Sequence, residues 1–81
     1  MEKRLGVVAV ILEDKEYADQ VNDVLHNYNQ IIIGRMGLPY KERSVAVISL
    51  IVDATNDEVS ALTGKLGRIK GVTVKSALAK G

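Results

Sequence analysis

The residues best suited to ligand chemistry lie in one short segment, Gly34-Arg35-Met36-Gly37-Leu38-Pro39-Tyr40. A guanidinium presents a fork of N–H donors that matches a carboxylate or a phosphate, so Arg35 is predicted to anchor a small anion. A salt bridge to another subunit is its alternative role. Gly34 and Gly37 would let a ligand or another backbone approach closely, and a β-bulge explains them equally well. Met36 falls at the opposite strand parity to Arg35, with Ile32, so alternation predicts that Arg35 and Ile32 lie on opposite faces of the strand.

Two further side chains are candidates for such a site. His26, the one histidine of the chain, falls near the end of a predicted helix, where the helix dipole favours a positive charge. One histidine supplies too few ligands for a transition-metal site unless subunits share it. Tyr40 could stack on a ligand or close a hairpin against the core. The predicted ligand-binding residues are therefore Arg35, His26, Tyr40, Gly34 and Gly37, with no metal site and no cofactor assigned.

Residues for catalysis are scarce. The absence of Cys excludes a thiol nucleophile, thiolate metal ligands and a disulfide framework. The sequence places no serine or acid beside His26 as a triad would require. The acid pairs Glu13-Asp14 and Asp57-Glu58 stand at helix starts, where the helix dipole accounts for them. We predict a protein that is not an enzyme, with a small oligomeric enzyme or a metal-handling accessory protein as the alternative.

Six elements are predicted to position these residues. Apolar runs and alternation indicate strands near 5–12, 31–38, 45–52 and 72–78. Apolar residues at helical spacing indicate a helix between the first two strands, with Asp14 as its cap. A second helix is expected after a capping box formed by Thr55 and Glu58, and Gly67 is expected to end it. The stripe residues are Ala18, Val21, Val24, Leu25 and Tyr28 in the first helix and Val59, Leu62 and Leu66 in the second.

The element order βαββαβ predicts an α+β, ferredoxin-like fold as a single domain over residues 1–81. In that topology the first and third strands are central in a four-stranded antiparallel sheet, and both helices cover one face. The first and third strands are apolar at both parities, as central strands should be. The other sheet face would then expose several Val, Ile or Leu side chains. We therefore predict a homo-oligomer that packs through this face.

Composition narrows the choice of partners. Hydrophobic residues make up 47% of the chain and the net charge is +1, which is typical of a folded domain. The longest apolar run, Leu5 to Leu12, is too short to cross a bilayer, so no membrane contact and a cytoplasmic location are predicted. Residues 59–81 hold five bases and no acid. Without an aromatic stacking platform or a helix-turn-helix pattern, direct nucleic-acid binding is not favoured.

The sequence also resembles a known family. The segments that carry the resemblance are 25–28, 31–40, 47–50 and 62–67, with Gly-Arg-Met-Gly-Leu-Pro-Tyr as the most specific motif. They are similar to small bacterial proteins described as iron-only hydrogenase system regulators. More distantly, the expected fold resembles ACT-like regulatory domains and the C-terminal domain of the nickel-responsive repressor, both of which assemble through their sheets. The repressor's nickel site uses several His and a Cys, so that site does not transfer to this chain.

The resemblance implies a regulatory protein. We expect a non-enzymatic, oligomeric domain that senses a small anionic effector at a subunit boundary near the second strand, and that passes a signal to a protein partner. A role linked to an iron-only hydrogenase system is implied by the resemblance alone.

Overall fold

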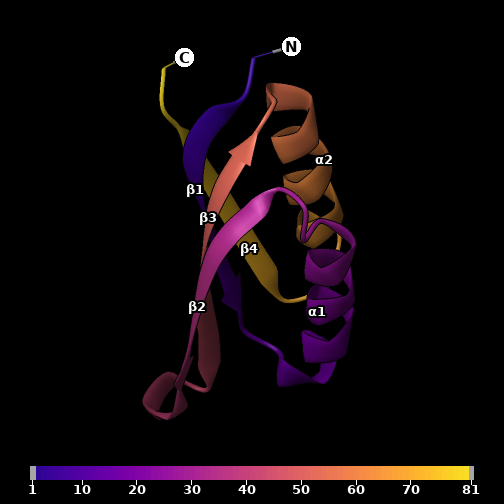
Figure 1. The fold of residues 1–81 in the computed structure, drawn as a ribbon. Coiled ribbons are helices and arrows are strands. Elements are labelled where there is room, and N and C mark those ends of the chain that lie inside the picture. Colours follow the sequence, from indigo (N-terminus) through magenta and orange to yellow (C-terminus); the bar gives the residue numbers. More distant parts are fainter. Residues whose placement is uncertain (1, 81) are drawn as a thin grey trace.

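A computed structural model describes residues 2–80, which form one antiparallel sheet covered on one face by two helices (Figure 1). The elements are β1 (Arg4–Leu12), η1 (Lys15–Tyr17), α1 (Ala18–Asn27), β2 (Ile32–Tyr40), η2 (Lys41–Arg43), β3 (Val45–Ala54), α2 (Asn56–Gly67) and β4 (Val72–Leu78), where η marks a short 3₁₀ turn. The order in the sheet is β2-β3-β1-β4. The predicted ferredoxin-like topology is confirmed, with β1 and β3 in the centre.

The core lies between the sheet and the helices. Along β1 the side chains of Val8, Val10 and Leu12 are buried, while their odd-numbered neighbours Val7 and Ile11 are exposed. The predicted helix stripes supply the other half of this core, through Val21 and Leu25 of α1 and Val59, Leu62 and Leu66 of α2. Each fully buried aliphatic side chain contributes roughly 1.5–3 kcal/mol, so this layer holds both helices against the sheet.

The start of α2 follows the predicted capping box. The backbone N–H of Thr55 donates to Glu58 Oε1 at 2.9 Å, and the backbone N–H of Glu58 donates to Thr55 Oγ1 at 3.2 Å. The hydrogen bond from the Thr55 backbone lowers the pKa of the Glu58 carboxyl, because it favours the charged form. Asp14 caps η1, accepting from the N–H of Glu16 at 3.0 Å, and α1 continues from that turn.

Gly67 ends the second helix as predicted, but without the left-handed backbone for which glycine is usually used there. Helix α2 ends at Gly67, but its C-cap residue is Arg68 in ordinary right-handed helical backbone. The glycine that adopts left-handed backbone is Gly71, with φ of 78°, in the turn before β4. A Cβ at Gly71 would lie 2.9 Å from the Cβ of Asp14, so the close approach of this turn to Asp14 also requires glycine.

A β-bulge in β2 changes which side chains share a face. Ile32 pairs with Val52 and Gly34 pairs with Ile51, so Ile33 is an extra residue in β2. Simple alternation had placed Arg35 on the opposite face from Ile32. The inserted residue shifts the register by one and brings Arg35 to the helix-covered face, opposite buried Leu50.

The sheet face that carries no helix is named the open face here. It contains every large hydrophobic side chain that the structure exposes among residues 2–80, with exposed fractions from 38% to 73%. These residues are Leu5, Val7 and Ile11 from β1, Ile33, Met36, Leu38 and Tyr40 from β2, and Ile51 from β3. No helix within residues 2–80 is long and apolar enough to span a membrane.

Candidate functional site

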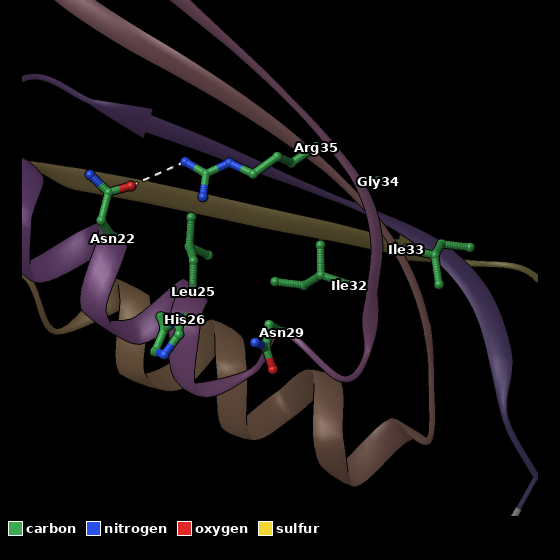
Figure 2. Close-up of a pocket in the computed structure, with 8 residues that line it drawn as sticks. All are labelled: Asn22, Leu25, His26, Asn29, Ile32, Ile33, Gly34 and Arg35. Carbon is green, nitrogen blue, oxygen red and sulfur yellow. Dashed lines mark hydrogen bonds between the residues drawn. The ribbon is translucent and has the colours of Figure 1, made fainter.

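A pocket lies where α1 and the turn after it face edge strand β2, on the helix-covered side of the sheet (Figure 2). Its volume is about 490 Å³, which is within the usual range for small-molecule sites. The pocket is open to solvent along the sheet edge. Its lining residues are Asn22, Leu25, His26, Asn29, Ile32, Ile33, Gly34 and Arg35.

The side of the pocket formed by α1 and the turn after it carries polar side chains, and the bottom of the pocket is apolar. Asn22 and His26 are four residues apart and so lie on one side of α1, and Asn29 follows in the turn that leads to β2. All three are exposed, whereas Leu25 beside them is buried and Ile32 is half-buried. The pocket therefore offers two carboxamides and an imidazole around an aliphatic surface.

Arg35 reaches across the pocket to α1. Its Nη2 donates a hydrogen bond to Asn22 Oδ1 at 3.1 Å, shown as a dashed line in Figure 2. A guanidinium has five N–H donors, so this bond leaves four for a ligand. Arg35 is the one formally charged residue of the lining set, which contains no carboxylate. An anion is therefore the ligand that the charge of this site favours.

The bulge makes this arrangement possible. It places Ile32 and Arg35, three residues apart, on the same side of β2, although strict alternation would separate them. The extra residue Ile33 is among the lining residues, and its side chain points away from the others (Figure 2). A Cβ at Gly34 would meet Ile51 Cγ1 at 3.7 Å, an ordinary contact, so Gly34 is not required by steric crowding.

The structure brings together three of the five residues predicted for the site, Arg35, His26 and Gly34. The other two lie outside the lining set. Gly37 is farther along β2 opposite Ile48, where a Cβ would meet nothing within 4 Å. Tyr40 ends β2 on the open face, so it is on the other side of the sheet from the pocket.

Two lining residues, Asn22 and Asn29, were not predicted from the sequence. Their signal was present, because Asn22, His26 and Asn29 follow one another at spacings of four and three residues. That spacing describes one side of a helix, next to the apolar stripe that was identified. Within residues 2–80, the structure brings no three His, Asp or Glu side chains together as metal ligands would be.

The fold is shared with known structures. A βαββαβ sheet with two helices on one face is shared with ACT domains. The ACT domain of GTP pyrophosphokinase from Chlorobium tepidum superposes with a TM-score of 0.77 at 22% identity, over 93% of this chain and 99% of that domain. The C-terminal domain of the MgtC protein from Mycobacterium tuberculosis superposes with a TM-score of 0.70 at 15% identity, over 95% and 88% of the two chains. These likenesses show an ACT-like fold.

Residues 4–76 match the model of the TM1266-like family, described as "Iron-only hydrogenase system regulator, putative". The structure of the uncharacterized protein TM1266 from Thermotoga maritima is 39% identical, with a TM-score of 0.92 over 98% of this chain and 100% of that chain. The chain belongs to the TM1266-like family, and the predicted resemblance is confirmed. No curated protein sequence is similar enough to match the chain.

Proposed function

We propose that this chain is a non-enzymatic regulatory domain that binds a small anion in the pocket between α1 and β2 and works as a homodimer through the open face. The observation that carries the sensing role is the position of Arg35. Its guanidinium stands in a pocket with carboxamide groups, an aliphatic base and no carboxylate. An anion bound there would gain charge-assisted hydrogen bonds while its apolar part contacts Leu25 and Ile32.

The chemistry of the pocket supports binding over catalysis. Its polar groups are one guanidinium, one imidazole and two carboxamides. Carboxamides and a guanidinium orient a ligand by hydrogen bonds, and they are poor proton acceptors at neutral pH. The imidazole of His26 is exposed, and the structure gives it no hydrogen bond from another side chain among residues 2–80. A general base normally has a third group that orients it.

The size of the open face supports a second copy of this chain as its partner. Its eight exposed hydrophobic residues are on average about half exposed. At roughly 200 Å² for a large residue they offer about 800 Å² per copy, which is the amount that one partner contributes to a standard interface. Sheet faces pack on one another about 10 Å apart with interdigitating side chains. Two copies would thus form a layer that resembles the core of a β-sandwich.

Membership of the TM1266-like family supports a regulatory role linked to an iron-only hydrogenase system. We propose that the protein acts in the cytoplasm and that a protein partner binds the ligand-bound dimer.

The test compares Arg35→Gln with Arg43→Gln, a matched loss of one exposed arginine in η2, away from the pocket. Thermal unfolding is recorded in the presence of a panel of small carboxylates and phosphates. We expect at least one anion to raise the Tm of the wild type and of Arg43→Gln, but not of Arg35→Gln. Sedimentation in the same buffer should show all three proteins as dimers. If Arg35→Gln responds to the same anions as the wild type, the assigned sensing role of Arg35 is wrong.

A further inference from the structure

We propose that the β2 bulge couples the two parts of the proposed function, so that an anion in the pocket strengthens dimerisation through the open face. The inference rests on the proposed function, because it needs both the pocket and the dimer. The structural basis is that three consecutive residues serve both surfaces. Ile33 contributes its side chain to the open face, and Gly34 and Arg35 line the pocket.

The two side chains project from opposite sides of the same short segment. Figure 2 shows Arg35 directed toward α1 and Ile33 directed away from it. Ile33 is 61% exposed, the second-highest exposure among the large hydrophobic side chains, so its position affects what the open face presents to a partner. A shift in the backbone at Gly34 would move both side chains.

The bulge has less strand pairing than the central strands. Edge strand β2 pairs with β3 alone, and Ile33 itself has no partner in that pairing. The segment is fixed on one side by the bond from the N–H of Asp53 to the carbonyl of Ile31, at 3.0 Å. On the other side its link to α1 is the Arg35–Asn22 hydrogen bond between two exposed side chains. A single hydrogen bond of this kind contributes little to the stability of the bulge, so a ligand that also binds Arg35 can stabilise the bulge substantially.

These contacts fix the direction of the coupling. An anion on Arg35 holds the guanidinium on the helix-covered side and so maintains the bulge. The maintained bulge keeps Ile33 on the open face, where the partner copy packs. Since coupling between binding sites is reciprocal, dimerisation must raise the affinity of the pocket for the anion by the same factor.

The test places a carboxylate in the pocket covalently. The chain has no Cys, so a thiol introduced by His26→Cys is unique. Alkylation with iodoacetate attaches an anionic carboxymethyl group, and iodoacetamide attaches a neutral group of nearly the same shape. The same two adducts on Gln20→Cys, an exposed α1 position outside the pocket, serve as the control. Dimer dissociation constants come from sedimentation equilibrium, and Tm values report the local effect of the adduct.

We expect the anionic adduct at position 26 to lower the dimer dissociation constant about fivefold or more relative to the neutral adduct. At position 20 the anionic and neutral adducts should have nearly the same dimer dissociation constant. The same should hold at position 26 when Arg35→Gln or Ile33→Ser is added. If the two adducts of the single variant His26→Cys have the same dimer dissociation constant, but the anionic adduct raises the Tm, the coupling is wrong and the pocket assignment stands. Monomers at every concentration would overturn both the dimer and the coupling.

Discussion

The dimer interface can be tested with two substitutions at neighbouring positions of the central strands. Val7 and Ile51 are paired across β1 and β3, and both lie on the open face with exposed fractions of 43% and 40%. The double variant Val7→Thr with Ile51→Thr keeps β-branched side chains that suit a strand. It replaces apolar surface by hydroxyl groups where the partner copy would pack.

The magnitude follows from these exposed fractions. Complete burial of a Val or Ile side chain stabilises by roughly 1.5–3 kcal/mol. Because about 40% of each side chain is still exposed in the single chain, dimer formation would add about 40% of that stabilisation at each position. A two-fold dimer contains each residue twice, so the double variant loses about 3 kcal/mol of association free energy. The dimer dissociation constant should therefore rise about a hundredfold. A buried hydroxyl without a partner would increase this loss.

Sedimentation equilibrium over a wide range of concentration measures the dissociation constant, and urea unfolding of the variant reports its fold. The exposed substitution Ala61→Ser on α2 is the control and should leave the dissociation constant unchanged. A dissociation constant that changes less than about threefold in the double variant, while both proteins remain folded, would refute the assignment of the open face as the interface.

Four further predictions concern the fold. Thr55→Ala should lower the free energy of unfolding by about 1 kcal/mol at pH 7, measured by urea denaturation, because it removes a cap from α2; an unchanged value would contradict the role of the capping box. The pKa of Glu58 is lowered in the folded state, so the stabilisation by its carboxylate is present above the unfolded pKa and is lost as the pH falls through the folded pKa. The loss in free energy of unfolding caused by Glu58→Gln should therefore shrink in urea series recorded at acid pH, below about pH 4. Leu62→Ala, at a fully buried position, should cost about 3 kcal/mol in the same denaturation assay, and a cost under 1 kcal/mol would mean that α2 does not pack as described. Gly6→Ala would bring a Cβ to 2.8 Å from the carbonyl oxygen of Ala77 and should lower the Tm by several degrees, whereas Gly37→Ala has open space and should leave the Tm within about 2 °C of the wild type.

Much of the fold was predictable because burial patterns repeat along the chain. β1 and β3 are apolar at both parities since one parity forms the core and the other forms the open face. Thr55 and Glu58 marked the start of α2 through a spacing that is local in sequence. Gly67 was correctly placed at the end of α2, whereas the glycine in left-handed backbone, Gly71, was not singled out, because its role depends on the approach of Asp14 from a distant segment.

The site was only partly predictable, because a bulge changes strand parity and leaves no fixed sequence mark. Arg35 was identified from its residue type and its glycine neighbours, but alternation placed it on the opposite face from Ile32. The shift between Ile32 and Gly34 depends on how β2 pairs with β3, which is a tertiary property. Tyr40 was grouped with Arg35 by closeness in sequence, although the two side chains lie on opposite faces of the sheet.

Native mass spectrometry of the freshly purified protein tests the anion site and the dimer in one measurement. We expect a dimer of the 8.8 kDa chain that retains a small anion in each pocket, and an Arg35→Gln dimer that has lost it. A monomer at all concentrations would contradict the open-face interface. A ligand retained equally by the wild type and by Arg35→Gln would contradict the pocket as the sensing site.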